Sequence, residues 1–260
     1  MLAILKLGGS ILCNKNIPFS VKTDNLQRFA VEIKKGIEYY KNKNEEFNLI
    51  IIHGGGSFGH PVAKKYIKIE NNKKIFYNMN KGYWEIQKAM RQFNNIVIEE
   101  LQKKDIPAVS IQPSSFISFD NNGNLNFDLT VINGMLKRNL IPIIHGDIVL
   151  YGNNNYKIFS GDHALPYLSK QLNPNLSLHA SDVNGVYDNN KKTIHVINSN
   201  NINSVLKCLK PSDKQDITGG MYLKVMECYN LGIKTVIFNG NIENNIYKSL
   251  IGKVEGTKIN

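Results

Sequence analysis

The chain has 260 residues, enough to bury a sizeable core in one large α/β domain or two small ones. Its 32 Lys and Arg residues outnumber 21 Asp and Glu, and the net charge of +11 favours an acidic partner: nucleic acid, a membrane surface or a phosphorylated small molecule. The lysines are scattered among asparagines and acids, without an Arg-rich run or an aromatic-basic ladder, which argues against nucleic acid. Codon composition is the simplest explanation of the Lys and Asn excess.

The cysteines and the hydropathy pattern indicate the cellular compartment of the protein. Cys13, Cys208 and Cys228 are widely spaced and follow no metal-binding pattern, which indicates a reducing interior. The first residues lack a basic segment followed by a long apolar core, so we expect no signal peptide. No apolar run approaches the roughly 20 residues that span a bilayer. We therefore expect a soluble, cytoplasmic protein with no membrane partner.

The N-terminal third predicts a strand, a helix and a second strand. Residues 3–7 form an apolar strand that stops at Gly8-Gly9-Ser10. A helix cap at Thr23-Asp24 is followed by apolar residues at helical spacing. These are Leu26, Phe29, Ala30, Ile33, Ile37 and Tyr40. With a strand at 49–52 the order is β-α-β, which is typical of parallel strands with right-handed crossovers.

A glycine run after the second strand organises the rest of the chain. Gly54, Gly55 and Gly56 follow His53 where a strand turns into a helix, and Pro61 suits a first helical position. Such a strand, glycine run and helix start direct backbone N–H groups and the positive end of a helix dipole at one point, which suits a phosphate. A glycine-rich hairpin is the alternative, but no matching alternating strand follows.

The middle of the chain alternates strands and helices. We expect a polar, lysine-rich excursion over a site at 66–82, a long helix at 83–101 and a strand at 107–111. Short strands at 116–119 and 125–127 flank a turn, and a helix at 131–138 precedes a strand at 141–144. That strand stops at His145-Gly146-Asp147. His53 and His145 each close an isoleucine-rich strand and could equally be core residues.

The C-terminal part continues the same alternation. It predicts a hairpin from 148–151 to 156–159, a helix through Leu165, Leu168 and Leu172 that follows Ser160-Gly161-Asp162, a helix at 202–209, and strands at 176–180 and 234–238. A further helix bearing Lys224 starts at Thr218-Gly219-Gly220. With no linker or repeat, the pattern indicates one domain over 1–260, with lobes of about 1–150 and 151–260. The fold class is α/β: an open, mostly parallel sheet with helices on both faces, in three αβα layers.

Several predicted strands end in polar, glycine-containing sequences, where open α/β sheets bind ligands. Neither a G-x-x-x-x-G-K-[ST] loop nor a helix-opening G-x-G-x-x-G is present. Lys6 lies between Leu5 and Leu7 in a buried strand, which requires an anionic partner.

Five motifs, in order over nearly the whole chain, resemble the amino acid kinase superfamily. They are Lys6-x-Gly8-Gly9-Ser10, His53-Gly54-Gly55-Gly56, Ser160-Gly161-Asp162, Asp182-Val183-x-Gly185-Val186-Tyr187 and Thr218-Gly219-Gly220-x3-Lys224. Within the superfamily, Lys15, the stretch from Gly54 to His60 and His145-Gly146-Asp147 resemble the archaeal isopentenyl phosphate kinases. The resemblance implies the open three-layer fold described above.

It also implies transfer of the γ-phosphoryl group of ATP to isopentenyl phosphate, giving isopentenyl diphosphate. Such a reaction needs alignment and charge neutralisation more than covalent chemistry. The acceptor phosphate, with a second pKa of about 6, is largely dianionic, so no general base is required. Lys6 and Lys224 would bridge the transferring group with assistance from Lys15, and Asp162 would fix the two lysines or serve as a helix N-cap.

The resemblance assigns further residues to each substrate, and His60 would hold the acceptor phosphate. The other acceptor-side residues are Gly8, Gly54, Gly55, Gly56, Gly59, Gly146 and Asp147, the last pair through backbone N–H groups. The nucleotide side comprises Lys6, Gly9, Ser10, Asp182, Gly185, Tyr187, Gly219, Gly220 and Lys224. The N-terminal lobe would therefore bind the acceptor and the C-terminal lobe the nucleotide.

Other features leave alternatives open. The family usually has an acid at His163 and Asp at Asn184, which puts local electrostatics and nucleotide affinity in question. An apolar set could form a pocket for a five-carbon tail or simply pack in the core; it comprises Phe76, Met79, Tyr83, Ile86 and Met90. Mg2+ would enter with ATP rather than occupy a protein metal site. A homodimer follows by analogy only.

Rival interpretations are a superfamily kinase for fosfomycin, a nucleoside monophosphate or a carboxylate, and a non-catalytic nucleotide-binding protein of the same fold.

Overall fold

The computed structural model describes residues 1–14, 16–70, 73–209 and 220–260. A central sheet of eight strands has the order β12-β14-β13-β11-β1-β2-β8-β5. Six neighbouring strands, from β13 to β5, are mutually parallel, whereas β14 pairs antiparallel with β13. The six are β1 (Leu2–Leu7), β2 (Asn48–His53), β5 (Ala108–Ile111), β8 (Ile141–His145), β11 (Leu176–Ser181) and β13 (Thr235–Asn239). The expected mostly parallel sheet is confirmed.

Alternate residues of the central strands pack into two separate cores, one on each face of the sheet. In β1, Leu5 belongs to one cluster and Ile4 to the other; in β2, Ile51 and Ile50 divide in the same way. Because side chains alternate along a strand, this division requires helices on both faces. The near-continuous apolar sequence of these strands is therefore the signature of a sheet buried on both sides.

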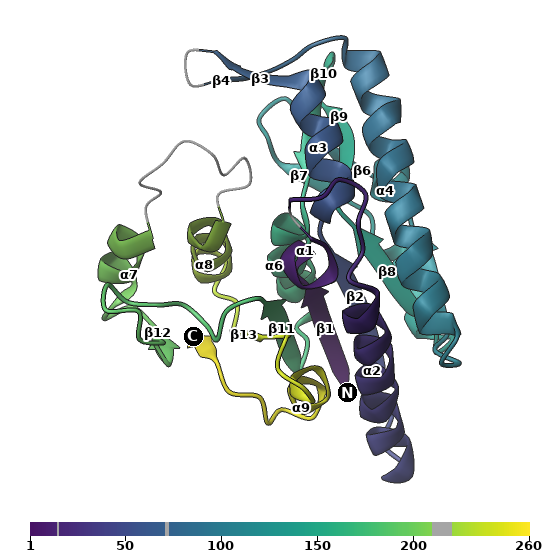
Figure 1. Ribbon diagram of the computed structural model, residues 1–260, viewed down its shortest axis with the longest axis vertical. Helices are drawn as coiled ribbons and strands as arrows, with labels where there is room; N and C mark the ends of the chain where they lie inside the picture. Colours follow the sequence, from purple (N-terminus) through teal and green to yellow (C-terminus); the bar gives the residue numbers. More distant parts are fainter. Residues whose placement is uncertain (15, 71–72, 210–219) are drawn as a thin grey trace.

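Helices cover both faces, as Figure 1 shows. The Leu5 face packs against α2 (Thr23–Asn42), α3 (Gly56–Tyr66), α4 (Met79–Gln102) and α9 (Asn245–Leu250), with the short α1 (Gly9–Leu12) at the end of β1. The opposite face packs against α5 (Thr130–Leu136) and α6 (Gly161–Leu172). Beside α6, a third cluster joins α7 (Ile202–Leu209) and α8 (Gly220–Asn230) to the β12–β14 edge.

Two smaller sheets extend the first half of the chain. A four-stranded sheet has the order β10-β9-β6-β7. It contains the predicted hairpin, β9 (Asp147–Tyr151) with β10 (Asn155–Phe159), and the predicted short strands β6 (Ile117–Phe119) and β7 (Leu125–Phe127), which pair with each other. The predicted excursion at 66–82 contains another hairpin, β3 (Ile67–Glu70) with β4 (Lys73–Phe76). In Figure 1 this hairpin extends beyond the end of α3.

Some short elements were not predicted from the sequence, namely α1, α9, η1 (Pro113–Ser115), β12 (Val196–Ile197) and β14 (Thr257–Ile259). A three-residue strand or a one-turn helix contains too few residues to show a period of 2 or 3.6. Their positions depend on tertiary contacts: β14, for example, adds to the free edge of β13.

The expected first helical position for Pro61 is wrong. Helix α3 starts at Gly56, so Pro61 lies inside it and cannot donate a hydrogen bond to the carbonyl of Ser57. That carbonyl instead accepts from the backbone N–H of Phe19 at 3.0 Å. The Ser57 hydroxyl donates to the carbonyl of Ser20 and accepts from its N–H. The segment after α1 therefore compensates for the missing helical hydrogen bond.

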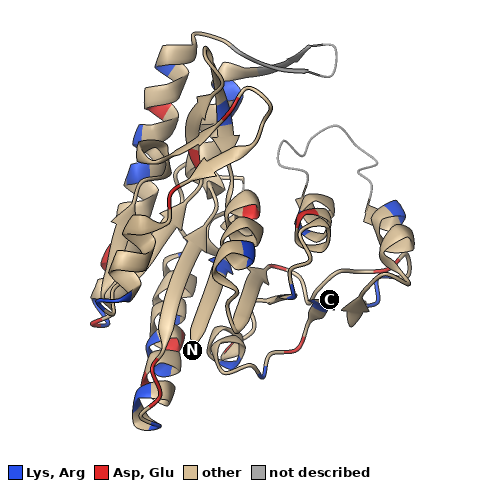
Figure 2. Cartoon of the chain, turned by 180° about the vertical axis from the view of Figure 1, so that it is seen from behind, with Lys and Arg blue, Asp and Glu red and all other residues tan. Residues whose placement is uncertain are grey.

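Charged residues of both signs lie along the outer helices, whereas the central strands are almost entirely uncharged (Figure 2). This interspersed pattern is that of a solvated surface rather than a single basic stripe. Among the described helices, none is both long and apolar enough to cross a membrane.

Candidate active site

A cavity of about 650 Å³ opens where the carboxyl ends of β1, β2 and β11 meet the starts of α3, α6 and α8. It is lined by the predicted residues Lys6, Gly8, Gly9, Ser10, Gly54, Gly55, Gly56, His60, Asp162, Asp182, Gly220 and Lys224. Further lining residues are Ser160, Gly161, His179, Ser181, Val183 and Met221. Segments that are far apart in the sequence thus converge at the sheet edge where parallel α/β folds bind ligands.

An ion pair between Lys6 and Asp162 lies in the floor of this cavity. The Lys6 Nζ donates to Asp162 Oδ1, and the two side chains are only 4% and 10% exposed. Burial lowers the pKa of Lys6 to about 8, although the Asp162 carboxylate opposes this shift. Burial alone would raise the pKa of Asp162, but the positive charges of Lys6 and Lys224 outweigh it and hold that pKa far below its usual range. The carboxylate is therefore ionised at neutral pH.

Lys224 approaches the same carboxylate from α8. Its Nζ lies 3.7 Å from Asp162 Oδ1 and 3.2 Å from the carbonyl of Gly220, to which it donates. Asp162 thus stands between two ammonium groups carried by different elements, the arrangement predicted for it. Such a pair of cations presents concentrated positive charge to an anion in the cavity.

The stem of Lys6 fits because Gly161 has no side chain. A Cβ at Gly161 would lie 2.8 Å from Lys6 Cε and 3.1 Å from Ile52 Cγ2. The first distance is shorter than real Cβ contacts and the second is tighter than most of them, so glycine as the first residue of α6 leaves the Lys6 stem its room. In the Ser160-Gly161-Asp162 motif, the glycine therefore makes room for Lys6 and the aspartate pairs with it.

The acid expected after Asp162 is replaced by His163 without loss of the helix cap. The His163 Nδ1 lies 3.3 Å from the backbone N–H of Ser160, which donates to it, in the position that Glu or Gln occupies in a capping box. The substitution is therefore explained by local helix chemistry at the start of α6.

The two glycine-rich strand ends touch each other. A Cβ at Gly9 would lie 3.0 Å from both the Cα and the N of Gly56, and one at Gly8 would lie 2.8 Å from the carbonyl oxygen of Ala180. Gly56 has φ of +50°, a conformation that side chains disfavour. The absence of side chains at these positions therefore lets β1, β2 and β11 end close together.

His60 lines the cavity from α3, beside the glycine run. A Cβ built on Gly55 would come within 3.6 Å of the His60 Cδ2. Gly59 has a different surrounding: a Cβ there would lie 2.7 Å from the sulfur of Met90. Gly59 is buried against α4, which explains the glycine by helix packing, and its predicted substrate contact remains a prediction.

Three predicted acceptor-side residues, Gly59, Gly146 and Asp147, do not line this cavity. The backbone N–H of Gly146 donates to the carbonyl of His53 at 3.0 Å and is not available to a phosphate, so that prediction is wrong. Asp147 is buried, and its carboxylate accepts from the N–H groups of Ser114 and Ile148. Gly146 instead supports the glycine run, because its Cβ position is 3.3 Å from the Gly55 nitrogen.

The two histidines whose role was left open are core residues. His53 Nε2 bonds to Asn94 Oδ1 at 3.0 Å, and the His53 and His145 rings stack with centroids 5.7 Å apart. Burial lowers the pKa of each to about 4, so both rings are neutral at physiological pH. Ile86 and Met90 likewise belong to the core, which was the alternative to a pocket for a five-carbon tail.

The loop after β11 divides its residues between the cavity and the fold. Asp182 and Val183 line the cavity, whereas Gly185 packs against β14, since a Cβ there would lie 2.4 Å from Thr257 Oγ1. The Tyr187 hydroxyl accepts from the backbone N–H of Asn184. The predicted nucleotide contacts of Gly185 and Tyr187 therefore remain predictions, with a structural explanation for each beside them.

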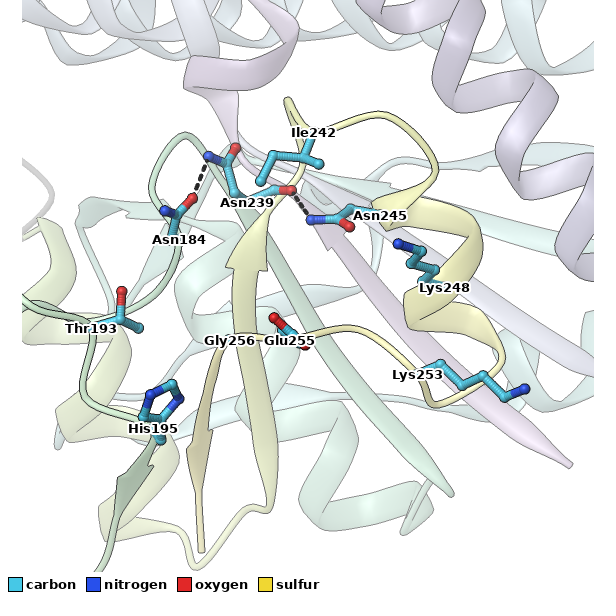
Figure 3. A pocket seen from close by; sticks show the side chains of 10 residues that line it. All are labelled: Asn184, Thr193, His195, Asn239, Ile242, Asn245, Lys248, Lys253, Glu255 and Gly256. Atoms are coloured by element: carbon cyan, nitrogen blue, oxygen red, sulfur yellow. Dashed lines mark hydrogen bonds between the residues drawn. The ribbon is translucent and has the colours of Figure 1, made fainter.

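Asn184 is not among the residues that line the Lys6 cavity and lies instead beside Asn239, as Figure 3 shows. It lines a separate cavity of about 410 Å³, in which Asn239 Nδ2 donates to Asn184 Oδ1 at 2.9 Å. The amide thus ties the Asp182 loop to the end of β13, a bond that the usual aspartate could also accept. Lys15, Thr218 and Gly219 lie outside the described residues, as does the side chain of Phe76.

Sequence reasoning missed His179. It lies on β11 directly opposite Lys6, and its Nε2 is 3.2 Å from the Lys6 Nζ. The only signal in the sequence is a histidine in an apolar strand, and its meaning depends on knowing that β11 pairs with β1.

Comparisons with known proteins agree with this site. The amino acid kinase family model matches residues 1–239. The chain is 58% identical to isopentenyl phosphate kinase of Methanocaldococcus jannaschii, covering 100% of this chain and 98% of that protein. It is 34% identical to the enzyme of the same name from Methanothermobacter thermautotrophicus, covering 98% of each. An X-ray structure of isopentenyl phosphate kinase matches the whole of both chains with a TM-score of 0.80 at 30% identity.

The motif order, the three-layer fold and the paired lysines around Asp162 all lead to the same assignment. The chain belongs to the amino acid kinase family and, within it, to the isopentenyl phosphate kinases.

Proposed function

We propose that this protein transfers the γ-phosphoryl group of ATP to isopentenyl phosphate, forming isopentenyl diphosphate and ADP. One observation carries the proposal: the glycine run with His60 and the Lys6–Asp162–Lys224 cluster line one cavity. The first can hold the acceptor phosphate and the second the phosphoryl group in transfer. The affiliation of the chain with isopentenyl phosphate kinases supports the choice of acceptor.

The transfer needs no base from the protein. An oxygen of the acceptor phosphate attacks the γ-phosphorus, the bond from that phosphorus to the bridging oxygen breaks, and ADP leaves with the electron pair. Because the second pKa of a phosphate monoester is about 6, the attacking oxygen is already deprotonated at neutral pH. The main barrier is the mutual repulsion of two anions, which fixed positive charge beside them lowers.

The two lysines supply that charge from both sides. Lys6 comes from β1, in the proposed acceptor-binding lobe of about 1–150, and Lys224 comes from α8, in the proposed nucleotide-binding lobe of about 151–260. Asp162 holds them at a fixed spacing without neutralising both. Backbone N–H groups of the glycine run and the positive end of the α3 dipole add partial positive charge beside His60.

Mg2+ would accompany ATP, bound mainly by phosphate oxygens, as is usual for this cation in kinases. Among the described residues, the carboxylates that line the cavity are those of Asp162 and Asp182, and Asp162 pairs with lysines. Within the described part of the chain, no cluster of three or more His, Cys, Asp or Glu side chains is arranged to hold a metal ion. The ion would supply charge neutralisation for the β- and γ-phosphates.

A homodimer in the cytoplasm is the setting we propose. Cyclic dimers are the commonest oligomers, and Trp84 on α4 and Leu150 on the neighbouring β9 expose about half of their apolar side chains. Light scattering tests the dimer: a monomer mass across the working concentration range would exclude it.

A panel of acceptors tests the proposed activity. The protein is assayed with Mg-ATP and, separately, isopentenyl phosphate, dimethylallyl phosphate, fosfomycin, uridine monophosphate and acetylglutamate. The highest kcat/KM is expected for isopentenyl phosphate. Preference for uridine monophosphate or acetylglutamate would overturn the assignment, and absence of any ATP turnover would favour a non-catalytic nucleotide-binding protein.

His60→Ala tests the acceptor side. Removing one hydrogen bond to a charged phosphate should lower kcat/KM for isopentenyl phosphate about 10- to 100-fold while leaving the KM for ATP near its original value. His195→Ala is the matched control, since His195 is an exposed histidine that lines the other cavity. Unchanged acceptor kinetics in His60→Ala would favour a carboxylate kinase instead.

A further inference from the structure

The Lys6 ammonium has two hydrogen-bonding neighbours, a carboxylate and an imidazole. Asp162 Oδ1 accepts from it on the α6 side, and His179 Nε2 lies 3.2 Å away on the β11 side. Lys6 and His179 occupy directly opposed positions in the parallel β1–β11 register, so their side chains leave the sheet on the same face. Lys6 is 3% and His179 1% exposed, so the sheet and α6 hold both side chains in place.

The chemistry of the two groups fixes the direction of their hydrogen bond. A lysine ammonium has three N–H donors and no acceptor, so Nε2 of His179 must accept and the ring proton must lie on Nδ1. Burial, followed by the positive charges of Lys6 and Lys224, keeps the pKa of His179 well below its ordinary value. The ring is therefore neutral and serves as an acceptor without adding another cation to the cluster.

Two of the three N–H groups of Lys6 are thereby engaged. The rest of the side chain has little freedom, since a Cβ built on Gly161 would lie only 2.8 Å from Lys6 Cε and Ile52 is paired beside Lys6 in the β1–β2 register. Rotation of the ammonium about its Cε–Nζ bond would break both hydrogen bonds at once. The remaining N–H is then held in one direction, and the cavity that Lys6 lines is where an acceptor for it can lie.

We propose that His179 is a positioning residue for phosphoryl transfer: it accepts one N–H of Lys6, Asp162 accepts the second, and the third points at the phosphoryl group in transfer. This inference rests on the proposed function, because it needs Lys6 to contact that group. An apolar residue at 179 would leave one buried N–H without a partner and the ammonium free to turn. A carboxylate there would instead remove positive charge from the cavity.

Two substitutions separate positioning from packing. His179→Leu keeps the volume and loses the acceptor, and we expect it to lower kcat about 10- to 100-fold with little change in either KM, as for loss of a hydrogen bond to a charged group. His179→Gln carries an oxygen about as far along the side chain as Nε2 and should restore kcat to within about threefold of the original. Ser177→Ala, also on β11 but bonded to Ser169 and Thr235, is the control and should retain full kcat.

A spectroscopic measurement on the native protein tests the inference without depending on which phosphate substrate is used or on whether a variant folds. Histidine side-chain nitrogen NMR at neutral pH should show His179 as a neutral ring with Nε2 unprotonated. The inference would be overturned if Nε2 proved to be protonated. It would equally fail if His179→Leu kept its kcat, if His179→Gln were as slow as His179→Leu, or if the variants changed only the KM for ATP. If the native protein proves inactive on isopentenyl phosphate, the proposed function fails, while the ring spectrum still decides whether His179 accepts from Lys6.

Discussion

Lys6 combines two properties that conflict unless its partners are present. It lies in a buried strand, where an unpaired charge is costly, and it must remain charged to attract phosphate. Asp162 resolves this conflict by pairing with it inside the fold. In such a buried pair, loss of one partner costs more than replacement of both, because the remaining charge is left uncompensated.

Asp162→Asn should therefore destabilise the protein by about 3–5 kcal/mol, measured by urea unfolding at neutral pH. Adding Lys6→Met to that variant should recover a large part of the loss, since no buried charge then lacks a partner. Both variants should be inactive. If Asp162→Asn unfolds at the same urea concentration as the original protein, the ion pair is not the interaction that keeps Lys6 in place.

The pH dependence of kcat/KM also belongs to Lys6. Its protonated form is the active one and its pKa is about 8, so activity should fall as the pH rises through 8 rather than near the usual 10.5. Lys6→Arg, which keeps its charge throughout this range, should show lower activity without that alkaline decline. A native profile that stays flat across pH 8 would mean that another residue supplies the charge.

The residues of the site differ in how far the sequence alone could identify them. Lys6 was identifiable because a lysine between leucines in a predicted strand demands an anionic partner. Asp162 and Lys224 required the family motif, since nothing local distinguishes them from an N-cap and a surface lysine. His179 could not be found, because its role arises from strand pairing across 173 residues of sequence.

At the scale of elements, the close approach of two strand ends shapes the site. Gly9 in α1 has an ordinary φ, so helix propensity alone would favour alanine there. Its Cβ position is nevertheless 3.0 Å from backbone atoms of Gly56, and a backbone contact cannot yield as a flexible side chain does. Any side chain at Gly9 must therefore displace the glycine run.

Gly9→Ala should lower kcat/KM for isopentenyl phosphate about 10-fold or more, because a displacement of even 1 Å at a reacting group is costly. Gly134→Ala in α5 is the matched control: its Cβ would meet only the end of Arg138 at 3.8 Å. That variant should keep full activity and gain up to about 1 kcal/mol of stability. Equal activity of the two variants would contradict the steric argument.

Longer elements were predicted from periodicity, and the short strands β6 and β7 from the turn between them, whereas several other short elements were not predicted. Helices α2 and α4 and the strands β1, β2, β8 and β11 are long or apolar enough to show their period. The boundary of α3 was misjudged because Pro61 is a helix-start signal, and the contact that permits it inside the helix comes from Phe19, far along the chain. Tertiary hydrogen bonds thus overrode a local rule.

On the scale of the whole molecule, three neutral histidines lie in the strands of one sheet. His53, His145 and His179 are each 0–1% exposed, and their pKa values lie below the ordinary 6.5. Between about pH 6.5 and 4, the unfolded chain binds protons at these positions while the folded chain does not, so the free energy of unfolding must fall as the pH falls. Asp147, whose pKa burial raises, opposes this effect.

Chemical unfolding at about pH 7 and about pH 5 tests this, with a loss of roughly 2 kcal/mol expected for each fully buried histidine. In His145→Asn, which can keep the hydrogen bond to the Gly146 carbonyl, the loss should be smaller by about that amount. An identical acid loss in that variant would show that His145 is not neutral in the fold.

The central claim is that fixed positive charge at one sheet edge lets two phosphates react. The most direct measurement is the initial rate of isopentenyl diphosphate formation from Mg-ATP and isopentenyl phosphate, for the native protein, Lys6→Met and Lys103→Met. Lys103 is an exposed lysine on the surface, paired with Glu100, and its variant should match the native rate. Lys6→Met should be slower by a factor of about 100 or more, as for loss of a charge-stabilising donor. A native rate in Lys6→Met would contradict the account.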